Sequence, residues 1–337
     1  MSRSRELGIH IGDLETGPDD AITDVGGVRV GHTTLIEGDD IRTGVTMIVP
    51  PVTPLFAGCH RLNGNGELTG LEWVRESGML TTPIGITNTF SVGVVRDAIA
   101  AQSADDDAWA LPVVGETFDG FLNDAPGQHV TAAHAHRALE HAHDGPVEEG
   151  NVGGGTGMIC HGFKGGIGTA SRVVDGITVG VLVQANHGRR ARFRVNGSPV
   201  GERIGDAIPT PNYDEGAGSI IGIVATDAPL LPQQCDRLAQ RAGLGVARMG
   251  GAGENSSGDI FLALSTANRT IGDNEREHEL RMLSDEHITP LYYAVIDATE
   301  EAILNAILGA ETMTGRDGHT AHALTGDVLL EALATRP

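Results

Sequence analysis

One serine-containing segment combines residue types that could carry out acyl transfer. Residues 250–259 read GGAGENSSGD and lead directly into an apolar stretch. If the peptide bond before Ser256 or Ser257 were cleaved, the new α-amine, with a pKa of about 8, could serve as general base for that serine's hydroxyl. Asn, Ser and Gly are also common turn formers, and composition alone favours an ordinary loop between a helix and a strand.

A second candidate is Lys164 in the glycine-rich segment HGFKGGIGTASR, residues 161–172. It is the one lysine in a chain that otherwise uses arginine, which suggests a task that a guanidinium cannot perform. The glycines fit neither a phosphate-binding P-loop nor a dinucleotide fingerprint, because no strand–turn–helix context surrounds them. The structural alternative is a glycine-rich entry into a β-hairpin.

A third candidate is Asn186, at the end of the apolar run VGVLVQAN. An amide there could donate a hydrogen bond to the oxyanion that develops in acyl transfer. The alternative is that Asn186 simply begins a hairpin turn.

A fourth candidate is the pair Thr299 and Glu301 in the segment ATEE. Asp297 and Glu300 form a capping-box pattern, which predicts that a helix begins here and that its dipole favours these carboxylates. Simple capping is therefore one interpretation, and hydrogen bonding of Thr299 and Glu301 to the serine or its amine is the other.

Composition excludes several functional classes. The chain has 45 acidic and 23 basic residues, a formal net charge of −22, which would repel nucleic acid. The three cysteines, Cys59, Cys160 and Cys235, are far apart and show no ligand spacing, so we expect neither disulfides nor a zinc site. Five histidines fall within 129–143, but their offsets do not place a ligand set on one helix face. We therefore expect no metal and no cofactor.

The first residues, MSRSRELGIHIGD, contain no apolar signal-peptide region, and no stretch approaches 18 apolar residues. These features predict a cytoplasmic protein without a membrane partner.

Apolar periodicity and turn residues predict a layered arrangement of strands and helices. Strands are expected within 21–50, at 82–90, in a hairpin of 166–174 and 177–186 turning at Asp175-Gly176, at 218–230 and from Gly258. Helices are expected within 65–80, 91–104 and 129–143, from 231 to about Gly243, and from Asp297. This alternation is typical of an α/β or α+β layered fold.

Taken in order, several stretches resemble the L-aminopeptidase/D-esterase-amidase family of self-processing serine peptidases, also called the DmpA or β-aminopeptidase family. They are AITDVGGVRVGHTT, NGNGELTGLEWVRESGML, PIGITNTFSVG, NVGGGTGMICHGFKGGIGTASR, VGVLVQANHG, SIIGIVATDAPLLPQQCDRLAQRAGLGVAR, NSSGDIFLALSTAN and ATEEAILNA. Together they cover nearly the whole chain.

The resemblance implies an αββα sandwich of the N-terminal-nucleophile type, in a single domain spanning 1–337. It also implies cofactor-free removal of N-terminal residues from small peptides, amides or esters, and a homo-oligomer of processed αβ units. Ser257 would be the nucleophile, with cleavage into 1–256 and 257–337, and Ser256 is the neighbouring alternative. Asn186 would donate to the oxyanion, and Thr299 and Glu301 would support the serine. Phe118 stands where members of the family can carry a tyrosine.

Two other functions remain open at this stage. The same architecture serves N-terminal-nucleophile acyltransferases of the ornithine acetyltransferase type, in which the acyl group passes to an amine instead of water. The other alternative is an uncleaved small-molecule binding protein.

Overall fold

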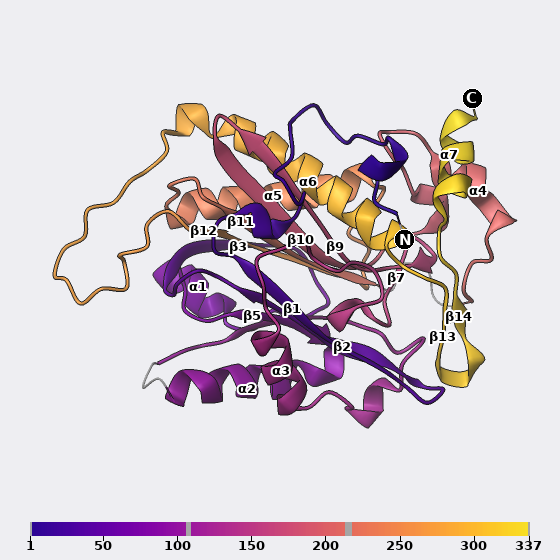
Figure 1. Cartoon of the computed structure of the whole chain (residues 1–337), viewed down its shortest axis with the longest axis horizontal. Coiled ribbons are helices and arrows are strands. Elements are labelled where there is room, and N and C mark those ends of the chain that lie inside the picture. Colours follow the sequence, from indigo (N-terminus) through magenta and orange to yellow (C-terminus); the bar gives the residue numbers. More distant parts are fainter. Residues whose placement is uncertain (1, 106–108, 213–217, 336–337) are drawn as a thin grey trace.

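Two stacked β-sheets lie between two layers of helices in the computed structural model (Figure 1). The structure describes residues 2–105, 109–212 and 218–335. This αββα arrangement is the fold that the resemblance implies, and it confirms the predicted α/β layered class.

The larger sheet has six strands and carries the candidate serine. Its order is β4 (Met79–Leu80), β3 (Leu55–Gly64), β12 (Gly258–Ser265), β11 (Ser219–Thr226), β10 (Ile177–Asn186) and β9 (Gly166–Val174). Neighbouring strands are antiparallel except β11 and β12, which run parallel. Every residue of β11 and β12 is buried, as expected of central strands covered on both faces.

The smaller sheet has four strands, in the order β1 (Arg29–Glu37), β2 (Ile41–Val49), β5 (Ile84–Asn88) and β6 (Val113–Thr117). Apolar side chains from both sheets form one continuous core between them. Its members include Ile48 and Ile86 of the smaller sheet and Leu182, Ile223 and Leu262 of the larger.

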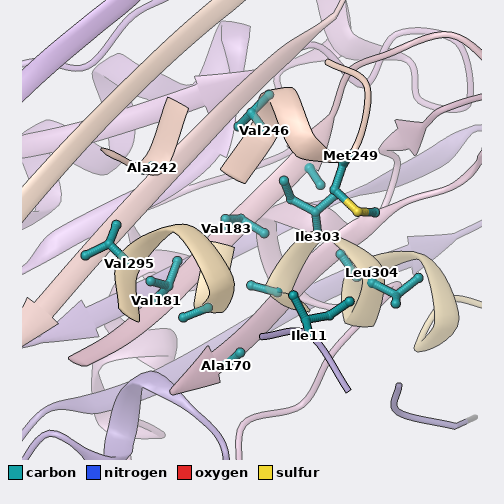
Figure 2. Packing of buried hydrophobic residues seen from close by; sticks show 14 of the residues in the cluster. Ile11, Ala170, Val181, Val183, Ala242, Val246, Met249, Val295, Ile303 and Leu304 are labelled. Atoms are coloured by element: carbon teal, nitrogen blue, oxygen red, sulfur yellow. The ribbon is translucent and has the colours of Figure 1, made fainter. Parts of the chain in front are cut away.

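The outer faces of the sheets are covered by one helix pair each. Helices α5 (Pro232–Arg248) and α6 (Thr289–Leu308) pack on the six-stranded sheet, and α2 (Val92–Asp105) and α3 (Ala132–Glu140) pack on the four-stranded one. Figure 2 shows the hydrophobic core between the six-stranded sheet and helices α5 and α6, in which strand valines contact apolar side chains of both helices. The residues labelled there include Ala170, Val181, Val183, Ala242, Val246, Val295, Ile303 and Leu304.

Shorter elements complete the described part of the chain. They are α1 (Leu71–Ser77), β7 (Ile159–Cys160), β8 (Phe163–Lys164), α4 (Val200–Ile204), β13 (Met313–Thr314), β14 (Thr320–Ala321), α7 (Gly326–Ala334) and several 3-10 turns. Helix α7 packs against α4 at the end of the molecule where the C-terminus lies (Figure 1). None of the helices in the described ranges combines enough length with enough apolar character to cross a bilayer.

Several predicted elements are confirmed. Strands β9 and β10 form the expected hairpin, and the turn residues Asp175 and Gly176 both have positive φ, at 52° and 75°. The glycine-rich segment after Lys164 therefore enters a hairpin. Strand β12 begins at Gly258, directly after the candidate serine.

The predicted end of α5 near Gly243 is wrong, since the helix continues to Arg248. Glycine in a helix interior is normally destabilising, but here Gly245 faces α6. A Cβ atom at Gly245 would lie 2.6 Å from Cβ of Thr299 and 2.7 Å from the carbonyl oxygen of Ile296. Close helix packing thus compensates for the weak intrinsic propensity.

The predicted start of the late helix at Asp297 is also wrong. Helix α6 begins at Thr289, with Pro290 in its first turn, so Asp297, Thr299 and Glu301 lie in its middle. The Asp-x-x-Glu pattern is therefore not a capping box. Arg248 of α5 contacts the carboxylates of both Asp297 and Glu300, and this pairing, not the helix dipole, balances their charge.

Candidate active site

Ser257 lies at the junction of a tight turn and a central strand. Its backbone N–H donates to the carbonyl of Glu254 at 2.8 Å, which closes a four-residue turn over 254–257. Ser256 is exposed at this turn, whereas Ser257 is buried with 4% of its surface accessible. The local turn that composition predicts is therefore present, and it directs Ser257 inward.

A carboxylate lies next to the buried hydroxyl. The Oγ of Ser257 donates to Oδ1 of Asp259 at 2.6 Å, while Oδ2 of Asp259 is buried with no hydrogen-bond partner in the described residues. Burial raises the pKa of Asp259 to about 6, and the hydrogen bond from Ser257 opposes that rise. Near neutral pH the group is therefore an acceptor for the serine proton.

The peptide carbonyl before Ser257 is also held by a side chain. Asn65, just beyond the end of β3, donates from Nδ2 to the carbonyl oxygen of Ser256 at 2.7 Å. Nearby, the amide of Asn63 donates to the carbonyl of Glu254, and Arg189 pairs with the carboxylate of Glu254 at 2.7 Å. The segment before Ser257 is thus fixed at three points, one of them the carbonyl that a serine nucleophile would attack.

A small cavity adjoins this serine. Its lining includes Ser257, Asp259, Glu254, His187 and Val246. The space is about 10 Å³, enough for the centre of about one water molecule. In the continuous chain the site therefore has no room for a peptide.

Asn186 lies at the same end of the six-stranded sheet as Ser257. It pairs in register with Ser219 of β11, which in turn pairs with Gly258 of β12. Its Oδ1 accepts from the backbone N–H of Ile159 at 2.8 Å, and its Nδ2 donates to the carbonyl of Phe118 at 3.0 Å. The Nδ2 group carries two hydrogens, so one is used by the Phe118 carbonyl and the other can donate to an oxyanion.

Glu301 is bonded to residues of the N-terminal segment and to Arg172. Its buried carboxylate accepts from Ser4 at 2.8 Å and Arg5 at 3.0 Å, and it forms a fully buried ion pair with Arg172. These partners anchor the N-terminal segment to α6.

The hydroxyl of Thr299 is hydrogen-bonded within its own helix, α6. Its hydroxyl donates to the carbonyl of Val295 one turn earlier at 2.7 Å, and its Cβ packs against Gly245. The hydrogen bonds and packing of Thr299 and Glu301 therefore lie within the helix layer and the anchored N-terminal segment.

Lys164 is fully buried on β8. Its ammonium donates to three backbone carbonyls, those of Gly155 at 3.3 Å, Met158 at 2.8 Å and Gly165 at 2.7 Å. Burial lowers the pKa of Lys164 to about 7. The lysine thus holds the glycine-rich turn of residues 153–158 against the hairpin entry, where a larger guanidinium would need more space.

Glu116 is a site residue that sequence reasoning did not single out. It is buried on β6, accepts from the backbone N–H of Glu67 at 3.0 Å, and is also bonded by the Thr89 hydroxyl. A Cβ atom at Gly66 would lie 3.1 Å from Oε1 of Glu116 and 3.0 Å from Cα of Gly258. Only a glycine at position 66 fits between the Glu116 carboxylate and the start of strand β12. Burial raises the pKa of Glu116, as expected of a carboxylate that forms no ion pair within the described part of the chain.

The available signals for Asn65 and Glu116 were the motifs NGNGELTG and GETFDG that surround them. Neither motif predicts which of its side chains faces the serine. Asn65 and Ser256 are 191 residues apart in sequence, so only the tertiary fold brings them together.

Comparison with known proteins identifies the family. The profile of Peptidase family S58 matches residues 20–321. The chain belongs to peptidase family S58. A β-peptidyl aminopeptidase BapA of Sphingosinicella microcystinivorans is 47% identical, over 96% of this chain and 89% of the relative.

Two solved structures extend this result. A β-aminopeptidase of a Burkholderia species matches with a TM-score of 0.93 and 52% identity over the full length of both chains. The L-aminopeptidase D-Ala-esterase/amidase of Ochrobactrum anthropi, described as a variant of the Ntn hydrolase fold, matches with a TM-score of 0.93 and 43% identity, covering 99% of this chain and 98% of that one. This S58 protein is therefore a serine aminopeptidase with the Ntn hydrolase fold, and the expected family, fold and enzyme class are confirmed.

Proposed function

We propose that the chain cuts itself before Ser257 and then removes N-terminal residues, β-amino acids among them, from small peptides and amides. The observation that carries the proposal is the Ser257–Asp259 hydrogen bond, set beside a Ser256 carbonyl that Asn65 already holds. The names of the relatives from Sphingosinicella and Burkholderia support the β-peptide preference. The burial of Ser257 and the exposure of Ser256 support Ser257 as the new N-terminus.

In the self-cleavage step, Asp259 takes the hydroxyl proton as Oγ of Ser257 attacks the carbonyl carbon of Ser256. The Nδ2 of Asn65 donates to the oxygen that becomes negative. The C–N bond then breaks, the Ser257 nitrogen takes up a proton, and an ester remains. Water hydrolyses that ester, which leaves a carboxylate on Ser256 and both hydroxyl and amine on Ser257.

In turnover, the freed amine of Ser257 replaces Asp259 as general base, and the hydroxyl attacks the substrate's carbonyl. Asn186 donates to the oxyanion through the second hydrogen of its Nδ2 group, while the first stays on the Phe118 carbonyl. Release of the segment ending at Ser256 would widen the small cavity, since that segment supplies Glu254 to its wall. Hydrolysis of the acyl-enzyme completes the cycle.

Glu116 would bind the substrate's ammonium group. An aminopeptidase must recognise that cation, and a buried carboxylate near the serine strand provides the complementary charge. An incoming ammonium would lower the pKa of Glu116 and so ionise the carboxyl that it pairs with.

The test is intact mass after purification, with a denaturing gel. Cleavage before Ser257 gives pieces of 256 and 81 residues, whereas cleavage before Ser256 gives 255 and 82. The Ser257→Ala variant should stay full length, while Ser256→Ala should still cleave. A wild-type chain that never cleaves would refute the self-processing mechanism.

Activity is then measured on the p-nitroanilides of β-alanine and L-alanine. Release of nitroaniline in water supports the aminopeptidase, whereas transfer to an added amine in preference to water would support the acyltransferase alternative. A single folding unit of both pieces, assembled into a homo-oligomer, remains a prediction that light scattering on the cleaved protein can test.

A further inference from the structure

We propose that Cys160, His161 and His187 form a binding site for a thiophilic divalent cation such as Zn²⁺, and that occupation of this site inhibits the enzyme. One donor atom from each side chain lies within 4.8 Å of the other two. The inhibition rests on the proposed function, while the binding does not.

The fold brings these ligands together from two separate segments. Cys160 ends the short strand β7, and His161 follows it with a left-handed backbone, φ 50°. His187 directly follows the last residue of β10, and the backbone N–H of His161 donates to its carbonyl at 2.7 Å. The sequence predicts no zinc site because its ligand spacing is not one of the short, regular patterns.

The hydrogen bond of His161 determines which of its ring nitrogens can bind a metal ion. Its Nδ1 lies 3.2 Å from the carbonyl oxygen of Arg189. A carbonyl can only accept, so Nδ1 carries the proton and Nε2 keeps its lone pair. That Nε2 is buried and has no partner among the described residues. A ring nitrogen bonded to a backbone carbonyl is the usual support for a metal-ligating histidine.

His187 and Cys160 fit the remaining positions. The Sγ of Cys160 is 3.8 Å from Nδ1 of His187. Zn–S and Zn–N bonds of about 2.3 and 2.0–2.1 Å in a tetrahedral site place sulfur and nitrogen about 3.6 Å apart. Small side-chain shifts would therefore bring the three ligand atoms within bonding distance of one ion, and a water molecule can be the fourth ligand.

The protonation states of the three groups suit a metal. Burial lowers the pKa of His161 to about 4 and that of His187 well below its usual value, so both rings are neutral ligands near pH 7. Burial raises the pKa of Cys160 to about 12, so metal binding must displace the thiol proton. The resulting thiolate neutralises one of the cation's two charges. The other cationic groups beside the site are Lys164, whose charge favours the Cys160 thiolate, and Arg190, whose Nε bonds the His161 carbonyl.

The site is coupled to catalysis through Asn186. The two residues beside the metal ligands, Ile159 and Asn186, are joined by the bond from the Ile159 N–H to the Asn186 Oδ1. A cation held by Cys160 and His187 would clamp these segments and fix the Asn186 amide in place, so that its second Nδ2 hydrogen cannot move toward an oxyanion as the charge develops. His187 also lines the cavity beside Ser257, so an ion bound to His187 would lie close to the proposed nucleophile.

The experiment titrates the purified full-length protein, in whichever processed state it occurs, with Co²⁺ and then Zn²⁺. Wild type should bind one equivalent of Co²⁺ and show a thiolate-to-cobalt charge-transfer band that Zn²⁺ abolishes. Affinity should increase with pH, because the thiol must lose its proton. Zn²⁺ should lower kcat for β-alanine p-nitroanilide with little change in KM, the pattern of a lost transition-state contact.

The variants are Cys160→Ala and, as a matched control, Cys235→Ala, a second buried free cysteine. Cys160→Ala should lose the band, weaken Zn²⁺ affinity by at least about 100-fold and escape inhibition, while Cys235→Ala should behave as wild type. If Cys160→Ala does not fold, Cys160→Ser keeps the volume and still removes the thiolate.

Absence of the band in wild type, or an equal band in Cys160→Ala, would overturn the site. A band with unchanged kcat would overturn the inhibition. A chain that shows the band but never cleaves or hydrolyses would refute the proposed function and leave the metal site standing.

Discussion

The hydroxyl of Ser257, the residue before strand β12, donates a 2.6 Å hydrogen bond to the carboxylate of Asp259, the second residue of that strand. Alternate side chains of a strand point to the same face, so positions 257 and 259 share one side of the sheet. The proposed nucleophile and its proposed base are thus positioned by three consecutive residues of one segment.

The Asp259→Asn variant should cleave itself about 10² to 10⁴ times more slowly than wild type, because a general base typically contributes that factor. The time course of the 81-residue fragment on a gel measures the rate. Asp227→Asn, at an exposed aspartate after β11, is the control and should cleave normally. Equal rates for wild type and Asp259→Asn would show that another group takes the proton.

Self-cleavage should depend on pH through Asp259. The pKa of this carboxyl is raised to about 6, so the ionised base is present above pH 6 and is lost as the pH falls through that value. The rate should therefore rise about tenfold per pH unit below 6 and level off above it. Refolding purified precursor across pH 4–8 tests this, and a rate that is flat through pH 6 contradicts it.

The Asn65→Ala variant should slow self-cleavage by about 10² to 10³, the cost of one oxyanion donor. Asn63→Ala is the matched control, because Asn63 also holds the turn but through the Glu254 carbonyl. If both variants slow cleavage equally, the amides act by holding the loop and Asn65 has no special part in the chemistry.

The Glu116→Gln variant should still cleave itself, because the internal bond before Ser257 has no ammonium group nearby to recognise. Its kcat/KM for β-alanine p-nitroanilide should fall by about 100-fold, since the substrate's cation would lose a buried ionic partner. Glu67→Gln, whose backbone but not carboxylate contacts Glu116 in the structure, is the control. Failure of Glu116→Gln to cleave would place this carboxylate in processing instead.

The Lys164→Met variant should lose stability and keep activity per folded molecule. Three buried carbonyls would lose their donor, which we expect to lower the free energy of unfolding by about 3 kcal/mol or more. Urea unfolding and kcat on the folded fraction separate the two effects. A loss of kcat in folded protein of normal midpoint would instead restore Lys164 to the catalytic residues that its rarity suggested.

The sequence alone determined the features that depend on neighbours along the chain. The turn at Asp175-Gly176 follows from residues that tolerate positive φ, and the buried strand after Ser257 follows from an unbroken apolar run. The ordered motifs determined the family and, with it, the layered fold. Local pattern was misleading at Asp297, where a capping-box signature lies in the middle of α6.

Only the tertiary structure decided which distant side chains meet. It brings Asn65 to the carbonyl of Ser256 across 191 residues and Glu116 to the serine strand past Gly66, and it removes Glu301 into an ion pair with Arg172. The reason is physical: a turn or strand depends on the φ and ψ preferences of adjacent residues, whereas these contacts depend on strand order and on how two sheets and two helix layers pack. No local pattern carries that information.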